Sequence, residues 1–135
     1  MRIFLTLPLV AALAGCAAGT PSEATLKFRA NESARLETAL AGLTPGKPQS
    51  CIRMRDAGST ESFGENILLF KVGKKLIYKN ETSGSCRRIG DGNALITRSF
   101  SGDFCRGDIA RSADLVAGFE SGSCAFGDFV PYRGS

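Results

Sequence analysis

The stretch NILLFKVGKKLIYK, residues 66–79, decides the fold class. Residues 66–72 form an apolar run of strand length, and residues 75–79 continue as a second apolar run. Gly73 and Lys74 separate the two, and a pair of apolar runs around a glycine-containing turn is typical of a β-hairpin. We therefore expect two antiparallel strands here.

Segments of similar texture lie on both sides of this hairpin and are broken by glycine, aspartate, asparagine and serine. Residues 51–55 alternate apolar and basic side chains, which is the pattern of a half-buried strand. Further strands are expected at residues 94–100, 109–111, 114–119 and 126–132. Turns roughly ten residues apart indicate a mainly β (α+β) domain, built as a small antiparallel sheet or barrel.

One short amphipathic helix is expected before the strands, at residues 31–41. Asn31 is a suitable N-cap, because its side chain can accept a hydrogen bond from the first turn. The apolar residues that recur at helical spacing and form one stripe are Leu36, Ala39, Leu40 and Leu43. This narrow stripe is expected to pack on the domain, with partner binding as the alternative.

The N-terminus has the features of an export signal. Residues 3–13 form a mostly apolar segment that is shorter than the roughly 20 residues of a membrane-spanning helix and fits the core of a signal peptide. Residues 13–16, LAGC, resemble the lipobox of bacterial lipoproteins, in which the cysteine receives diacylglycerol and the signal is cut before it. We expect residues 1–15 to be removed and Cys16 to carry the lipid. The alternative is an ordinary signal peptide cut at the ALA pattern of residues 12–14.

Lipidation at Cys16 would hold the chain firmly at a membrane, because two acyl chains anchor a protein stably and one does so only marginally. We expect a periplasm-facing location in the cell envelope. Ala17 stands where an aspartate tends to retain lipoproteins in the inner membrane, so the outer membrane is favoured. Residues 16–30 are small and polar and are expected to form a flexible tether to a single domain at residues 31–135.

The cysteine count agrees with lipidation. The chain has five cysteines, and removing Cys16 leaves four that can pair: Cys51, Cys86, Cys105 and Cys124. The chain has no histidine and no C-x-x-C motif, and its cysteine spacing matches no zinc pattern, so two structural disulfides are expected. Three pairings are possible. We favour Cys51–Cys124 with Cys86–Cys105, which would tie the first strand to the last.

The sequence assigns no catalytic, cofactor-binding or metal-binding residue. Without histidine, Ser-His-Asp and Cys-His sites are excluded. The tripeptide Arg106-Gly107-Asp108 is interpreted as a turn with an Arg–Asp contact. A formal net charge of +4 is too small to indicate a nucleic-acid partner. The aspartates that could form an acid pair all neighbour turn residues, where Asp normally bonds its own backbone; they are Asp91, Asp103, Asp108, Asp114 and Asp128.

Three motifs follow one another along the chain: SCI at residues 50–52, C-x-G-D at residues 105–108, and C-x-x-G-x-F at residues 124–129. Together with their neighbours over residues 35–132, they resemble a family of small proteobacterial exported proteins and lipoproteins of unknown function, common in sphingomonad-like bacteria. The resemblance implies export and the cysteine framework. It implies no catalytic activity.

Three hypotheses for function remain. The first is a non-enzymatic binding or structural module of the envelope, whose tether raises its affinity for a protein or glycan. Exposed aromatic and arginine side chains would form its contact patch, and the candidates are Tyr132, Arg133, Arg87 and Arg88. The second is a periplasmic inhibitor of a protease or lysozyme, which needs a protruding loop with a rigid tip. The third is a carboxylate-based hydrolase, which needs two acids that converge in a cleft.

Overall fold

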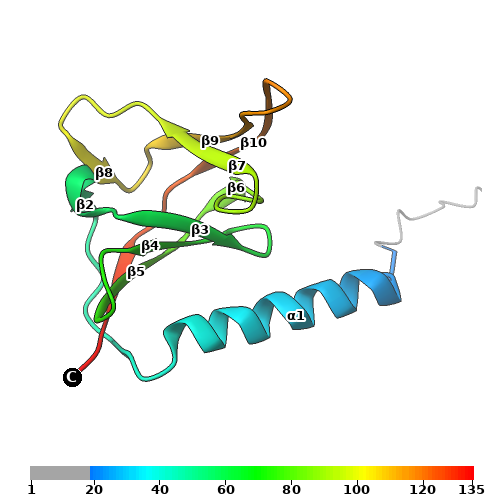
Figure 1. Cartoon of the computed structure of the whole chain (residues 1–135), viewed down its shortest axis with the longest axis horizontal. Helices are drawn as coiled ribbons and strands as arrows, with labels where there is room; N and C mark the ends of the chain where they lie inside the picture. Colours follow the sequence, from blue (N-terminus) through cyan, green and yellow to red (C-terminus); the bar gives the residue numbers. More distant parts are fainter. Residues whose placement is uncertain (1–18) are drawn as a thin grey trace, which may run out of the picture.

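The computed structural model describes residues 19–135, so the expected signal peptide and Cys16 lie outside the described residues. Within this range a single α-helix precedes a chain of short strands (Figure 1). All strand pairs are antiparallel, which confirms the expected mainly β fold. The elements are α1 (Glu23–Leu40), β1 (Thr44–Pro45), β2 (Cys51–Arg53), the 3-10 turn η1 (Met54–Asp56), β3 (Ser59–Phe63), β4 (Ile67–Lys71), β5 (Leu76–Glu81), β6 (Ser83–Ser85), β7 (Asn93–Thr97), β8 (Asp103–Cys105), β9 (Ile109–Asp114), β10 (Phe119–Ala125) and β11 (Phe129–Arg133).

The strands form three sheets. The first has five strands in the order β1-β11-β5-β4-β3, the second has four in the order β6-β10-β9-β7, and the third is the pair β2-β8. The hairpin expected from residues 66–79 is β4 paired with β5, with Leu69 opposite Lys79. Figure 1 shows α1 along one side of the five-stranded sheet and β7, β9 and β10 on the other side.

Strand β4 is buried on both faces, which explains its continuous apolar sequence. Leu68 and Phe70 point into a core between the two larger sheets, where the Phe70 ring lies 5.6–5.9 Å from the rings of three other phenylalanines. Leu69 points the opposite way, into a second core beneath α1. Successive side chains of a strand alternate between faces, so one strand serves both cores.

Helix α1 is longer than expected and begins at Glu23 rather than near Asn31. Its N-cap is Ser22, whose hydroxyl accepts a hydrogen bond from the Thr25 backbone at 3.2 Å. Residues 23–30, expected as part of the tether, are therefore helical. The expected stripe is confirmed, because Leu36, Ala39, Leu40 and Leu43 all pack on the second core. The N-terminal half of the helix leaves Leu26 and Phe28 exposed.

The strand expected at residues 114–119 is wrong. Strand β9 ends at Asp114 and β10 begins at Phe119, so the segment between them is the turn of a hairpin. The Asp114 carboxylate accepts hydrogen bonds from the backbone of Val116 and Ala117, both at 2.9 Å, which closes the turn. An aspartate that bonds the backbone two and three residues on is a turn signal that outweighs the apolar run after it.

The two disulfides join Cys51 to Cys105 and Cys86 to Cys124. The existence of two disulfides is confirmed, but the favoured pairing of Cys51 with Cys124 and Cys86 with Cys105 is wrong. Cys51 lies opposite Cys105 in the β2-β8 pair, and Cys86 follows β6, which pairs with β10 around Cys124. The disulfides therefore follow strand pairing, which the order of the cysteines in the sequence does not reveal.

Candidate functional site

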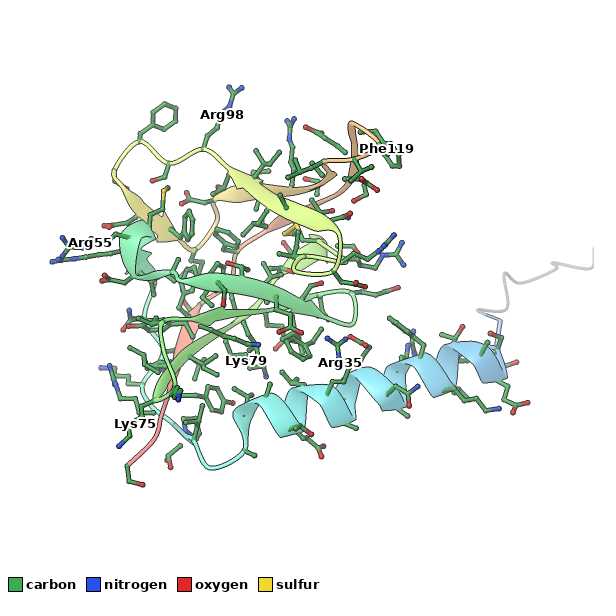
Figure 2. The ribbon with its side chains drawn as sticks, in the orientation of Figure 1. Arg35, Arg55, Lys75, Lys79, Arg98 and Phe119 are labelled. Carbon is green, nitrogen blue, oxygen red and sulfur yellow. A yellow bond between two sulfur atoms is a disulfide. The ribbon has the colours of Figure 1, made fainter. Side chains whose placement is uncertain are left out.

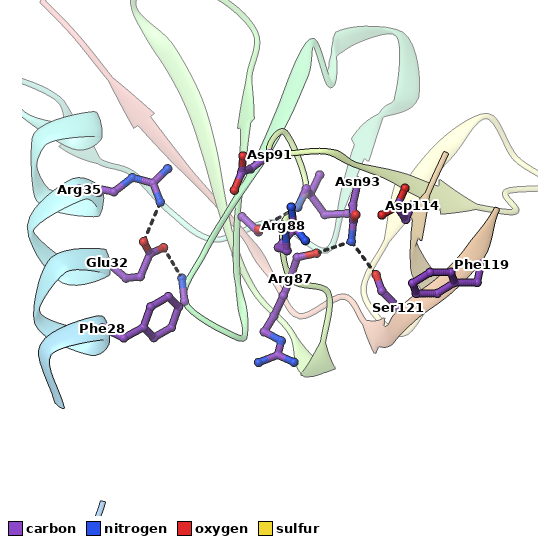
Figure 3. Close-up of a pocket in the computed structure, with 13 residues that line it drawn as sticks. Phe28, Glu32, Arg35, Arg87, Arg88, Asp91, Asn93, Asp114, Phe119 and Ser121 are labelled. Carbon is purple, nitrogen blue, oxygen red and sulfur yellow. Dashed lines mark hydrogen bonds and ion pairs between the residues drawn. The ribbon is translucent and has the colours of Figure 1, made fainter. Parts of the chain in front are cut away.

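A cleft of about 410 Å³ lies between the middle of α1 and the four-stranded sheet (Figure 3). Its walls come from α1, the β3-β4 turn, the loop of residues 86–93 and the β9-β10 hairpin. Two phenylalanines stand on opposite sides of it: Phe28 from α1 and Phe119 from β10. Phe28 is 45% exposed and Phe119 is 59% exposed, so both rings remain available to a ligand.

The helix wall is built on Glu32 and Arg35, one helical turn apart. Glu32 accepts a hydrogen bond from the Gly64 backbone at 2.8 Å and one from Arg35 at 2.7 Å. Arg35 also donates to Glu61 of β3 at 2.7 Å and lies over the Phe63 ring at 5.0 Å. These contacts fasten α1 to the five-stranded sheet and fix the helix side of the cleft.

The same contacts shift the pKa of both groups. Burial is the largest influence on Glu32 and would raise its pKa, but the hydrogen bonds from Gly64 and Arg35 and the Arg35 charge together outweigh it, so the pKa is lowered. The hydrogen bond to Glu32 is the main reason that the pKa of Arg35 is raised. Both side chains are therefore held in their charged forms.

The floor of the cleft is the loop of residues 86–93, which contains an unusual backbone conformation. Arg88 has a φ of 62° and is the one residue other than glycine with a positive φ among residues 19–135. Its carbonyl accepts hydrogen bonds from the backbone of Asp91 at 3.0 Å and of Asn93 at 3.1 Å. An arginine in the left-handed region is costly and persists where the surroundings enforce it, typically at a functional site.

Asn93 joins this floor to the hairpin wall. Its amide nitrogen donates to the Arg87 carbonyl at 3.3 Å and to the Ser121 hydroxyl at 2.6 Å. The Asn93 side-chain oxygen is buried and has no hydrogen-bond partner within the described residues. Buried polar atoms in native proteins are nearly always paired, so this oxygen marks a polar position beneath the cleft that lacks a donor.

The hairpin wall adds an acidic group opposite the helix. The hydrogen bonds from Ala117 and Val116 lower the pKa of Asp114, and the Arg88 charge lowers it further. Arg88 itself makes no ion pair with any residue of the range 19–135, whereas Arg87 lies 3.7 Å from Glu65. Acidic and basic side chains thus both line the cleft between the two exposed rings.

A second hollow of about 350 Å³ opens on the other side of Phe28 and Glu32. It is bounded by α1 and by the β3-β4 turn, including Leu36 and Ile67. The N-terminal half of α1 therefore stands over two adjoining hollows, and Phe28 and Glu32 separate them.

The structure divides the candidate contact residues. Arg87 and Arg88 line the cleft, as a contact patch requires. Tyr132 packs on the second core beneath α1 and is not part of the patch. Arg133 is at the end of β11 and does not line the cleft. The cleft as a whole was not predicted from the sequence, because single residues from four separate segments line it. The spacing of Glu32 and Arg35 was the one local signal of the cleft in the sequence.

The expected contact within residues 106–108 is also corrected. Arg106 pairs with Asp128 at 3.1 Å, not with Asp108. The Asp108 carboxylate instead accepts a hydrogen bond from the Cys105 backbone at 2.8 Å, as an aspartate in a turn commonly does. The segment remains a turn.

Two further observations concern residues 19–135. No group of three histidine, cysteine or acidic side chains in this range could hold a metal ion. No helix in it is long and apolar enough to cross a membrane.

Comparison with known proteins gives no significant match to a family model, to a curated protein or to a solved structure.

Proposed function

We propose that this chain is a lipoprotein of the cell envelope, anchored through Cys16, and that its β domain is a non-enzymatic module that binds an envelope glycan in the cleft. The observation that carries the proposal is the pair of exposed rings, Phe28 and Phe119, on opposite sides of a cleft lined by charged groups of both signs. The proposed location is the periplasmic side of the outer membrane.

Export is supported by two disulfides, which are typical of an oxidising compartment outside the cytoplasm. The LAGC sequence at residues 13–16 supports lipidation at Cys16. A tethered domain searches a small volume next to the membrane, so even a weak binding site becomes effective there.

A glycan fits the cleft for chemical reasons. Sugar rings present apolar C–H faces, which stack on exposed aromatic rings, together with a dense set of hydroxyls that donate and accept hydrogen bonds. The cleft offers the rings of Phe28 and Phe119 and, between them, guanidinium, carboxylate and hydroxyl groups from Arg88, Asp91 and Ser121. Its volume falls within the roughly 300–1,000 Å³ of small-molecule sites.

Two of the acids that line the cleft, Glu32 and Asp114, are better suited to binding than to hydrolysis. A glycosidase of the usual kind needs one carboxylic acid that stays protonated, and its pKa must therefore be raised. The pKa values of Glu32 and Asp114 are lowered instead. Both carboxylates are ionised near neutral pH and serve as hydrogen-bond acceptors.

Co-sedimentation with purified peptidoglycan sacculi tests the proposal. Arg88→Asn removes the guanidinium but keeps a residue that tolerates the left-handed backbone, and Phe119→Ser removes one ring. The matched controls are Arg98→Asn and Phe100→Ser, because both residues lie in the loop between β7 and β8 and neither lines the cleft.

We expect the unaltered protein and both controls to sediment with sacculi, and each cleft variant to bind about tenfold more weakly, as the loss of one good contact predicts. Circular dichroism should show that all four variants are folded. Equal binding by cleft variants and controls, or no binding by the unaltered protein, would contradict the proposal.

A second candidate, an inhibitor of a periplasmic protease or lysozyme, is favoured by one observation. The β9-β10 hairpin has the rigid, exposed tip that this function needs, and Val116 at its end is 96% exposed. Inhibition that is abolished by Val116→Asp, with sacculus binding unchanged, would distinguish this function from glycan binding.

A further inference from the structure

The tip of the β9-β10 hairpin is apolar and almost fully exposed. Leu115 is 72% exposed, Val116 96% and Phe119 59%, and residues 115–119 contain no polar side chain. Apolar side chains gathered at one protruding tip mark a contact with a partner surface or a membrane.

Three backbone N–H groups of this tip are paired within the hairpin. The N–H groups of Val116 and Ala117 donate to the Asp114 carboxylate, and the N–H of Gly118 donates to the Asp114 carbonyl at 2.9 Å. An unpaired N–H is costly in a lipid environment, where no water can satisfy it. Because three of its donors are already paired, the tip can enter the membrane interface at a lower cost than a loop whose N–H groups are all free.

The tip and the N-terminal end of α1 lie on the same side of the domain (Figure 1). The hairpin and the middle of α1 flank one cleft, and Phe28 lies roughly 9 Å along the helix from Ser22. The six-residue step from Cys16 to Ser22 can span at most about 20 Å. A lipid on Cys16 therefore keeps the Phe28 side of the cleft close to the membrane.

We propose that the β9-β10 tip inserts into the headgroup region of the membrane that carries the Cys16 lipid, so that the cleft opens next to that membrane. The inference rests on the proposed lipid anchor. A membrane fits the tip better than an enzyme cleft, because residues 115–119 offer no polar side chain for specific hydrogen bonding.

The sequence allows a direct measurement, because the chain contains no tryptophan. Val116→Trp places a single fluorophore at the tip, and Phe100→Trp is the matched control in the loop between β7 and β8. Strand β7 runs antiparallel to β9 with Asn93 opposite Asp114 and Thr97 opposite Ala110. The control loop and the hairpin tip are therefore at opposite ends of the sheet, and Figure 2 shows the same separation between Arg98 and Phe119.

Both variants would be expressed from the full-length sequence, purified as the mature protein and mixed with vesicles of phosphatidylethanolamine and phosphatidylglycerol, with and without brominated acyl chains. We expect the tryptophan of the vesicle-bound Val116→Trp protein to emit at a shorter wavelength than the tryptophan of the same protein in detergent-free buffer after release from the lipid. We also expect the brominated lipid to quench the emission of the vesicle-bound protein. We expect the Phe100→Trp protein to show neither effect.

Flotation of the vesicles separates the two proposals. If the protein floats and the Val116→Trp emission is not quenched, the tip is free for a protein partner and the membrane contact is overturned while the anchor stands. Equal quenching of both variants would overturn the orientation. Protein that does not float would overturn the anchor, and the membrane contact with it.

Discussion

The side chain of Asn80 in β5 bonds the backbone of Gly127 as a neighbouring strand would: its oxygen accepts from the Gly127 N–H at 3.0 Å, and its nitrogen donates to the Gly127 carbonyl at 2.8 Å. Asn80 is fully buried, and a Cβ on Gly127 would lie 2.3 Å from the Glu81 carbonyl. The Asn80 amide thus supplies the two hydrogen bonds that a paired strand would give to the backbone of Gly127, in the turn between β10 and β11.

Replacing this amide should be among the most damaging single changes in the domain. Asn80→Ala leaves the N–H and carbonyl of Gly127 without partners, so we expect a loss of about 2–4 kcal/mol in the free energy of unfolding, measured by urea denaturation. Asn66→Ala is the control, because Asn66 is exposed and should cost less than about 0.5 kcal/mol. Similar losses for both variants would contradict this account.

The fold class could be predicted because its signals are local. The hairpin of β4 and β5 was visible in two apolar runs around Gly73, and the helical stripe in the spacing of Leu36 and Leu40. The apolar run after Asp114 led to a wrong strand prediction, because a short apolar run alone cannot distinguish a strand from an exposed apolar turn.

The disulfide pairing and the cleft could not be predicted, because both depend on which distant segments lie side by side. Cys105 pairs with Cys51 through the contact of β2 with β8, although the two cysteines are 54 positions apart in the sequence. The cleft brings Phe28 to Phe119 only once α1 has packed over the sheet. No spacing in the sequence records these contacts.

The start of α1 gives a second prediction. Ser22→Ala removes the N-cap hydrogen bond, so we expect reduced helicity in circular dichroism and a local cost of about 1 kcal/mol. Asn31→Ala replaces an exposed residue inside the helix with the best helix former and should leave helicity unchanged or raise it. A loss of helicity in Asn31→Ala but not in Ser22→Ala would place the start of the helix at Asn31 and contradict the structure.

The disulfides can be distinguished by paired substitutions. Replacing Cys51 and Cys105 together by serine leaves the other disulfide intact, so the protein should fold, contain no free thiol between residues 51 and 124, and lose about 2–4 kcal/mol of stability. Replacing Cys51 and Cys124 together leaves two unpaired cysteines from different disulfides. Thiol labelling with mass spectrometry should detect both, and finding neither would contradict the observed pairing.

The two disulfides should also differ in their access to a reductant. Cys86 and Cys124 are buried at 1% and 3% exposure, whereas Cys51 and Cys105 are only partly buried. We expect a small phosphine reductant to open the Cys51–Cys105 disulfide first in the folded protein. Alkylation followed by peptide mapping would show the order, and simultaneous loss of both would indicate that reduction requires global unfolding.

Acid should weaken the contact between α1 and the sheet. The pKa of Glu32 is lower in the folded protein than its ordinary value of 4.5, so folding favours the ionised form. The resulting stability is fully present above about pH 4.5 and is lost as the pH falls through the folded pKa. Unfolding curves for Glu32→Gln should converge with those of the unaltered protein in that acidic range. Glu37→Gln, on an exposed residue with no ion pair within residues 19–135, should match the unaltered protein throughout.

Arg88 separates stability from binding. Glycine adopts a φ of 62° without strain, so Arg88→Gly should leave the free energy of unfolding unchanged or raise it by up to about 1 kcal/mol, while sacculus binding falls about tenfold. Arg98→Gly changes an exposed arginine whose φ is not positive, and it should lower stability slightly and leave binding intact. If Arg88 served the fold alone, Arg88→Gly would instead lower the free energy of unfolding and leave sacculus binding unchanged. Thermal unfolding and co-sedimentation of the two variants therefore decide whether the left-handed arginine is retained for the cleft.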